Sequence, residues 1–195
     1  MLGNGTITIT GTKESGVSGA NAGDVLIYGQ WSVIAGNLIA EGSTIKLLGV
    51  TSNDGGFEGG GKIYNKVWLS GTHTGYFDFR QPSLPTVNTI NELIIDQGRK
   101  ARFTAATTTN IGKLTALGSQ ANPITIGSVT AAPHNLIKTG ADMVEVEYCN
   151  ISNSIATPSD KWAAGDTSTD GGGNSGWTFK FIPIIMWFFG IFSKK

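Results

Sequence analysis

Apolar and polar residues alternate in short runs along most of the chain. In the run DMVEVEY, for example, Val144, Val146 and Tyr148 share one side of an extended chain, while Glu145 and Glu147 share the other. Gly, Asn, Asp, Pro or Ser bound nearly every such run, and the sequence has no long stretch with the period of a helix. This pattern predicts many short β-strands, each with one face toward a core.

The apolar pairs also recur along the chain at regular intervals, in two columns that share one slightly irregular period. The first column consists of Val25/Ile27, Ile45/Leu47, Val67/Leu69, Leu93/Ile95, Leu114/Ala116 and Leu136/Lys138. The second consists of Phe57, Phe77/Phe79, Phe103/Ala105, Ile124/Ile126 and Val146/Tyr148. A period of this length is typical of a solenoid, in which each coil completes the core of its neighbours.

The spacing therefore predicts an all-β solenoid of about six coils, with a body over residues 25–179. Residues 1–24 are assigned to an N-terminal strand or cap region, and residues 180–195 to an apolar C-terminal tail. An antiparallel β-sandwich is the alternative, because it also has short strands separated by frequent turns. The shared period and the scarcity of two-residue Asn-Gly or Asp-Gly hairpin turns favour the solenoid.

Composition excludes several classes of protein. Gly accounts for 28 of 195 residues, charged residues for 14%, and the net charge is zero. The chain is too apolar to be disordered, and it lacks the positive charge with which nucleic-acid binders neutralise phosphates. A single cysteine, Cys149, excludes an intramolecular disulfide and a multi-cysteine metal site.

Several phrases of the sequence resemble β-helical segments of tailed-phage virion proteins and of bacterial surface proteins. They are STIKL at Ser43–Leu47, FEGGGKIYNKV at Phe57–Val67, FTAATTT at Phe103–Thr109, ANPITI at Ala121–Ile126, residues 144–151, and the closing run from Trp162 to Phe179. The resemblance covers roughly residues 40–179 and lies in the order of the phrases. It implies a right-handed parallel β-helix, a structural role in a virion or outside the cell, and frequent homotrimers. It supplies no catalytic residues.

Candidate metal ligands and nucleophiles do not cluster in the sequence. His73 and His134 lie several coils apart, and neither has a partner at a ligand spacing. Cys149 is expected to point outward or to end a strand, as a small packing residue. The run Asp166–Asn174 has oxygen donors and glycines but lacks the order of a calcium loop, so a Gly-rich turn is favoured. No metal or cofactor is expected.

Polysaccharide hydrolysis needs two carboxylates at a defined separation. Glu145 and Glu147 share one face of a strand, and Asp78, Glu92 and Asp96 are further candidates that alternate outward. Such carboxylates on an outer strand face are usually solvated, and the sheet offers no long walls to enclose a substrate. The chain is therefore not expected to be an enzyme.

Two surface features are candidates for contact with a partner. Trp68 lies between the inward Val67 and Leu69, so it is expected to face outward under another subunit, a sugar or an overlying loop. Pro82, Leu84 and Pro85 lie in an insertion that lengthens one coil, which is predicted to protrude at a corner, as a solvated connection or part of a binding face.

The C-terminal tail is the sharpest functional clue in the sequence. It reads FIPIIMWFFGIF and ends in Lys194 and Lys195, and this apolar run is too short to span a membrane. Left exposed, its side chains would drive aggregation, so they are expected to be buried in an assembly, or less favourably at a membrane interface. The expected assembly or anchor residues are Phe181, Ile184, Ile185, Met186, Trp187, Phe188, Phe189, Ile191 and Phe192.

Together these features predict a non-enzymatic structural protein of a virion, as a phage fibre, spike or decoration element. Its expected partners are copies of itself, as a homotrimer, and capsid or tail proteins, with a host surface glycan as a further candidate. The alternative is a bacterial surface adhesin or carbohydrate-binding β-helix. The opening segment MLGNGTITITGTKESG shows no basic and apolar regions of a secretory signal, which weighs against it. A polysaccharide lyase or hydrolase is the third class.

Overall fold

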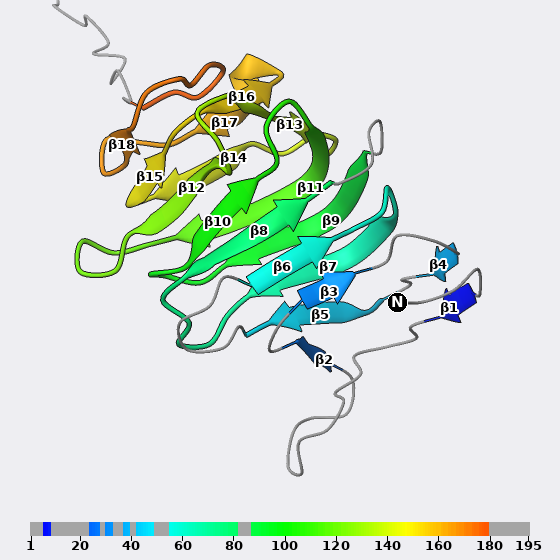
Figure 1. The fold of residues 1–195 in the computed structure, drawn as a ribbon. Coiled ribbons are helices and arrows are strands. Elements are labelled where there is room, and N and C mark those ends of the chain that lie inside the picture. Colours follow the sequence, from blue (N-terminus) through cyan, green and yellow to red (C-terminus); the bar gives the residue numbers. More distant parts are fainter. Residues whose placement is uncertain are drawn as a thin grey trace, which may run out of the picture.

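The computed structural model describes residues 6–8, 24–27, 30–32, 37–39, 42–48, 55–81 and 87–179. In these residues the chain is a parallel β-solenoid, with its strands piled one above another (Figure 1). Every pair of named strands within them is parallel. The predicted solenoid is confirmed, and the antiparallel sandwich is excluded.

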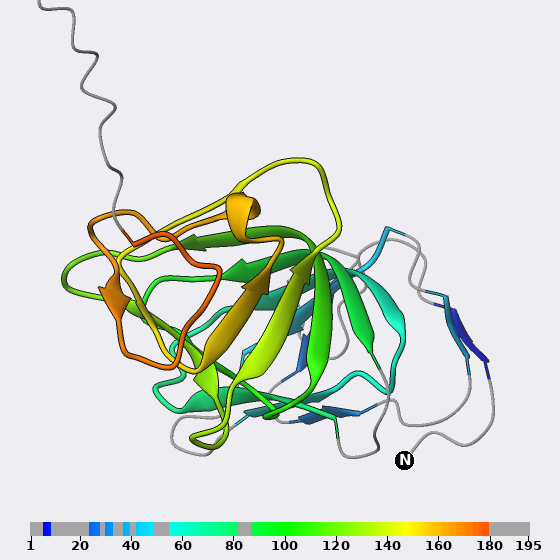
Figure 2. The same ribbon diagram turned by 90° about the horizontal axis from the view of Figure 1, so that it is seen from above.

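Two stacks of strands form the body, and Figure 2 shows them from above, with the orange C-terminal segment in front. The first stack, in spatial order, contains β3 (Gln30–Ser32), β6 (Gly55–Glu58), β8 (Tyr76–Arg80), β10 (Lys100–Phe103), β12 (Ile124–Ser128), β15 (Cys149–Ile151) and β18 (Thr169–Asp170). The described residues thus place seven strands in this stack, so the coil count differs slightly from the predicted six.

The second stack contains β2 (Asp24–Ile27), β5 (Thr44–Leu47), β7 (Ile63–Leu69), β9 (Asn88–Ile95), β11 (Thr108–Leu117), β13 (His134–Lys138) and β16 (Ser154–Thr157). From β11 a branch leads to β14 (Val144–Glu147) and on to β17 (Trp162–Ala163). Apart from both stacks, β1 (Thr6–Thr8) pairs with β4 (Asn37–Ile39), and a short 3-10 helix, η1, spans Ser159–Lys161.

A corner divides the second stack into two faces. The first half of β11 pairs with β13, whereas its end pairs with β14. The register between β9 and β11 skips Gly112, where an added Cβ would lie 2.5 Å from the backbone oxygen of Asn91. We call the second of these faces the corner-to-end face. It consists of β2 and β5, of the C-terminal ends of β7, β9 and β11, and of β14 and β17. Gly112 therefore allows the chain to turn between two flat faces.

The register of the first predicted column is confirmed over five coils. The pairs Val25–Ile45, Ile45–Val67, Val67–Leu93 and Leu93–Leu114 lie side by side on neighbouring strands. The last step is wrong, because Leu136 pairs with Thr109 on the other side of the corner. Val146 takes the place next to Ala116. The regular sequence spacing from Leu114 to Leu136 thus joins two different faces.

The second predicted column is right in its first step and wrong afterwards. Phe57 pairs with Phe79, as predicted. Phe103 then pairs with Phe79 rather than Phe77, and Ile126 pairs with Ala101 and Ile151. Because side chains alternate with a period of two, a shift by two residues keeps every apolar residue inward, so alternation alone did not determine the register.

The strand around Val146 follows the predicted alternation only up to Glu147. Val144 and Val146 are buried, and Glu145 and Glu147 are exposed. Tyr148 was expected inward, but it adopts a positive φ of 49° and is half-buried. This turn reverses the alternation, so that Cys149 rather than Tyr148 enters the core.

A row of aromatic rings runs through the core across successive strands. Ring centroids lie 5.2 Å apart for Phe57 and Phe79, 4.6 Å for Phe79 and Phe103, and 4.7 Å for Phe103 and His134. All four side chains are almost fully buried. Burial of each phenylalanine ring contributes roughly 1.5–3 kcal/mol, so the row joins neighbouring coils into one core.

The last coil is covered by residues 171–179. Backbone bridges join Ile155 to Ser175 and Ala163 to Thr178. Trp177 packs edge-on against Trp162, with a centroid distance of 4.9 Å, and its Nε1 donates to Ser154 Oγ at 3.1 Å. This segment, called here the C-terminal cap, therefore protects both the core and part of the strand edge of the last coil.

Candidate functional site

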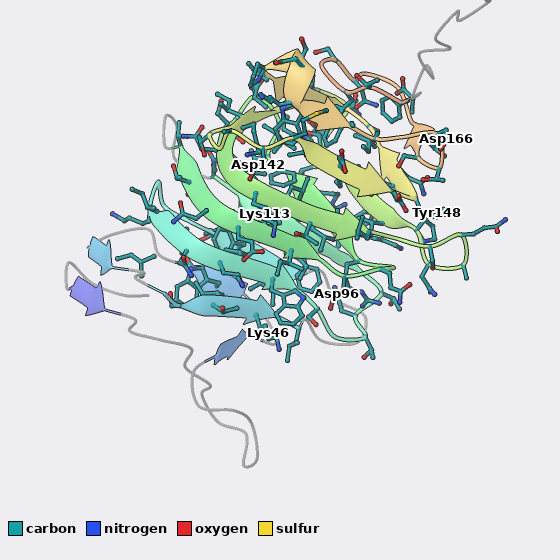
Figure 3. All side chains as sticks on the ribbon, turned by 180° about the vertical axis from the view of Figure 1, so that it is seen from behind. Lys46, Asp96, Lys113, Asp142, Tyr148 and Asp166 are labelled. Atoms are coloured by element: carbon teal, nitrogen blue, oxygen red, sulfur yellow. The ribbon has the colours of Figure 1, made fainter. Side chains whose placement is uncertain are left out.

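Trp68 lies on the outer side of the corner-to-end face, where alternation placed it. The ammonium of Lys46, on the neighbouring β5, sits 4.0 Å from the ring centroid. The indole Nε1 donates to Asp96 Oδ1 at 2.8 Å, and Ser70 Oγ donates to Asp96 Oδ2 at 2.7 Å. Neighbouring strands of the same chain thus partly cover the ring; Figure 3 shows Lys46 and Asp96 at this part of the molecule.

Glu92 occupies the centre of a charged row on the same face. Lys66 Nζ lies 2.8 Å and Lys113 Nζ 3.5 Å from its carboxylate oxygens, and the three residues come from adjacent strands. The hydrogen bond from Lys66 is the main cause that lowers the pKa of Glu92 below its usual value. Glu92 is therefore an ionised partner of two lysines.

Asp78 points away from the core on β8, yet it is buried. Arg102 Nε lies 2.7 Å from Asp78 Oδ1, and Arg102 Nη2 lies 3.1 Å from Oδ2, so the pair is bidentate. The guanidinium of Arg102 also lies 3.9 Å from the ring centroid of Tyr76. The Asp78 side chain points outward, as expected from the alternation. Its carboxylate is nevertheless enclosed by an arginine and is not open to a substrate.

Glu145 and Glu147 are the candidate carboxylates that are exposed on β14. Within the described part of the chain, no ion pair involves either of them. Together with Asp142 they line one side of a hollow on the corner-to-end face. Of the five carboxylates singled out from the sequence, these two are therefore the most available to a ligand or partner.

Both histidines are core residues. His73 is 2% exposed and stacks edge-on against Phe77, and His134 is fully buried beside Phe103. Burial lowers the pKa of His134 to about 4, because the core disfavours the charged imidazolium. Among the described residues, no group of three or more His, Cys, Asp or Glu side chains is placed to hold a metal ion.

Cys149 was expected to point outward or to end a strand, and the outward direction is wrong. It begins β15 with its side chain fully buried, and its Sγ lies 3.6 Å from the backbone oxygen of Ala116. Burial raises the pKa of the thiol to about 12. The thiol is thus protonated at neutral pH and acts as a small packing group.

The Gly-rich segment near the C-terminal cap forms a turn held by its own side chains. Asp170 Oδ1 accepts hydrogen bonds from Gly172 N at 2.9 Å and from Asn174 Nδ2 at 2.6 Å. Asn174 Nδ2 also donates to the Ile151 oxygen, and its Oδ1 accepts from Ser154 N. These bonds satisfy backbone groups of the last coil, in agreement with the predicted turn.

The remaining predicted site residues lie outside the described residues. They are Pro82, Leu84 and Pro85 of the insertion and Phe181, Ile184, Ile185, Met186, Trp187, Phe188, Phe189, Ile191 and Phe192 of the tail. Within the described residues, no helix has the length and apolar character needed to cross a membrane.

Two exposed apolar residues beside Glu145 and Glu147 were not singled out from the sequence. Leu117 is 57% exposed at the end of β11, and Met143 is 51% exposed just before β14. Both occupy outward slots of an alternating run, next to the inward Ala116 and Val144. A large apolar side chain in an outward slot was the signal that would have found them.

No protein-family profile matches the sequence, and neither a curated protein nor a solved structure matches the chain.

Proposed function

We propose that the chain is a non-enzymatic structural protein of a virion, a fibre, spike or decoration element that assembles as a homo-oligomer. The observation that carries the proposal is the parallel solenoid body with its continuous row of stacked core rings. Seven strands at about 4.8 Å per step give a shaft on the order of 30 Å long, in which each coil supports the next.

The outer charges are consistent with a structural role. Asp78, Glu92 and Asp96 are each engaged by side chains of the same chain. Glu145 and Glu147 lie two positions apart on one strand, where carboxylates of solenoids and sheets commonly keep the surface solvated. The proposal assigns these carboxylates to solubility and contact rather than to bond cleavage.

The tail supports assembly through its sequence. Its apolar residues would contribute roughly 1.5–3 kcal/mol each if they were buried between subunits. A homotrimer that joins capsid or tail proteins would bury them, and the virion is the corresponding location. A host glycan on the outer surface is a further partner that the proposal allows.

The direct test asks whether the chain is part of a particle. Virus particles would be purified by density gradient from the organism that encodes the chain, and labelled with an antibody raised against the full-length protein. The proposal predicts that the chain co-sediments with particles and that the label decorates them at fixed positions. Label on cell envelopes, with none on particles, would contradict it and favour the adhesin.

The enzymatic alternative needs its own measurement. The full-length chain would be incubated with capsular polysaccharide of the host, and released reducing ends would be counted, with the Glu145→Gln, Glu147→Gln double variant as the matched control. The proposal predicts the same background for both proteins. Release that requires the two glutamates would overturn the non-enzymatic assignment.

A further inference from the structure

A hollow on the corner-to-end face combines an apolar floor with an acidic side. It has a volume of about 410 Å³ and lies over the end of β11 and the start of β14. Its apolar lining comes from Leu114, Leu117 and Met143. Figure 3 labels Lys113 and Asp142, which lie at its edge.

The apolar part of this hollow is open to solvent. Leu117 is 57% and Met143 is 51% exposed, although both are large apolar side chains. A second hollow, of about 480 Å³, begins at Leu117 and Thr115 and extends past Ile94 toward Gly71. The two hollows share Thr115 and Leu117 and together form a groove across neighbouring strands. Its apolar part lies in the first hollow, and an exposed apolar surface of this kind is typical of a contact with another chain.

Carboxylates outnumber lysines in the lining of the first hollow, although Lys138 lies near Asp142. Glu145, Glu147 and Asp142 line the first hollow. Its one lysine, Lys113, lies 3.5 Å from the carboxylate of Glu92, while no ion pair within the described residues involves Glu145 or Glu147. An occupant should therefore be apolar and carry positive charge next to its apolar residues.

The C-terminal tail of this chain has that chemistry. Residues 181–192 are almost entirely apolar, and Lys194 and Lys195 follow them directly. The described chain ends at Phe179, next to Thr178, which bridges to Ala163; Ala163 in turn pairs with Glu145. Thr178 thus lies two strand spacings, about 10 Å, from the acidic strand.

The tail, when extended, is longer than the body of the solenoid, which is on the order of 30 Å long, so it can extend beyond its own body to another copy. Sixteen residues follow Phe179, and an extended chain of that length spans at most about 55 Å. We propose that the tail of one copy binds in the groove of a neighbouring copy, with its apolar residues on Leu117 and Met143 and its terminal lysines beside Glu145 and Glu147. This inference rests on the proposed assembly role of the tail and names its acceptor.

Site-directed crosslinking tests the acceptor in the full-length protein. One preparation carries Leu117→Cys and another, with a larger affinity tag, carries Phe192→Cys; a bismaleimide then joins thiols that are close together. The natural Cys149 is fully buried, which limits its reaction. After mixing under assembly conditions, we expect a crosslinked product that contains both chains.

The matched control replaces Leu117→Cys by Val129→Cys, because Val129 is 41% exposed but follows β12 in the other stack. We expect at least about tenfold less product with this partner. Equal crosslinking to both positions, or no product at Leu117→Cys, would overturn the proposal. A further variant carries both Leu117→Cys and Phe192→Cys in one chain. If its two thiols crosslink within the chain and not to a second copy, the tail in the groove does not come from a neighbouring copy.

Charge exchange provides a second readout that does not depend on a crosslinker. Glu145→Lys with Glu147→Lys should weaken self-association roughly tenfold, and Lys194→Glu with Lys195→Glu should do the same. Combining the four substitutions in one chain should restore association. Loss without restoration would reject the pairing. If removal of the tail leaves the assembly unchanged, the proposed assembly role of the tail fails. If assembly requires the tail but neither the crosslinking nor the charge exchange gives the expected result, only this acceptor site is rejected.

Discussion

Two roles of individual side chains recur in this solenoid: they pack in the core, or they form ion pairs on the outer side of the sheets. His134 illustrates the first role, since it extends a row of phenylalanine rings and its pKa is lowered to about 4 by burial. Asp78 illustrates the second, since a buried carboxylate on the outer side of the sheet is held by the fork of Arg102. Neither environment follows from the residue type, because alternation specifies a side of the sheet but not what covers it.

Protonation of His134 should make stability depend on pH. The imidazole pKa is about 4 in the folded chain and about 6.5 when unfolded, so the unfolded chain binds the additional proton between these values. Stability is therefore full above about pH 6.5 and falls as the pH decreases toward 4, by on the order of 3 kcal/mol.

Urea unfolding at several pH values between 4 and 7 measures this effect, with His134→Phe as the comparison. The substitution continues the aromatic row and removes the titrating group. We expect the variant to lose most of the decline in this interval. An identical decline in both proteins would show that other groups cause it.

Removal of the carboxylate at Asp78 should destabilise the chain. In Asp78→Asn, the guanidinium of Arg102 keeps its partly buried place but loses its charged partner, and Arg80 is also nearby. We expect a loss of about 1–3 kcal/mol in the free energy of unfolding. The control Glu145→Gln, on an exposed carboxylate, should change it by less than about 0.5 kcal/mol, and equal effects would contradict the assignment.

At the scale of strands, the sequence predicted the pairing register correctly within one flat face but not across a corner. The first column was right from Val25 to Leu114, because these residues lie on one flat face whose strands pair without a shift. It failed at Leu136, where the chain had crossed the corner. The second column failed beyond Phe79, because corner lengths vary and a two-residue shift preserves the alternation.

The same reasoning applies to the candidate surface. Outward Trp68, Glu145 and Glu147 were predictable from alternation, since each lies in a regular strand. Cys149 was misplaced because the positive φ of Tyr148 reverses the alternation, and no local residue type signals such a turn in a tyrosine. Pairings such as Asp78 with Arg102 depend on the register, so they could not be predicted before it was known.

The corner glycine provides a test at this scale. Gly112→Ala would place a methyl group 2.5 Å from a backbone oxygen, which cannot move as a flexible side chain does. We expect a loss of about 1–3 kcal/mol in the free energy of unfolding, measured with urea. Gly42→Ala is the control, since nothing lies within 4 Å of its added Cβ. If both variants were equally stable, the corner would not need its glycine.

For the molecule as a whole, two segments at the C-terminal end have opposite characters. The C-terminal cap completes the core with Trp177 against Trp162 and bridges the last strands. The sequence that follows Phe179 is almost entirely apolar up to Phe192, and we propose that these residues are buried against a partner. Residues 171–179 therefore close the body, and we propose that the residues beyond them make the contact between copies.

Loss of the cap should change both stability and association. Trp177→Ala removes a buried indole and exposes Trp162, for a loss of about 3–5 kcal/mol in the free energy of unfolding. The newly open end should also favour contact between bodies, which light scattering at increasing protein concentration would detect. Unchanged stability and scattering would show that residues 171–179 do not close the core.

Solution mass tests the central claim, that copies of this chain are held together by the C-terminal tail. Sedimentation equilibrium would compare the full-length chain with one that stops at Phe179, after circular dichroism has confirmed that both retain the same strand content. The account predicts an oligomer for the full-length chain and a monomer for the shortened one. The same mass in both, whether monomer or oligomer, would contradict it.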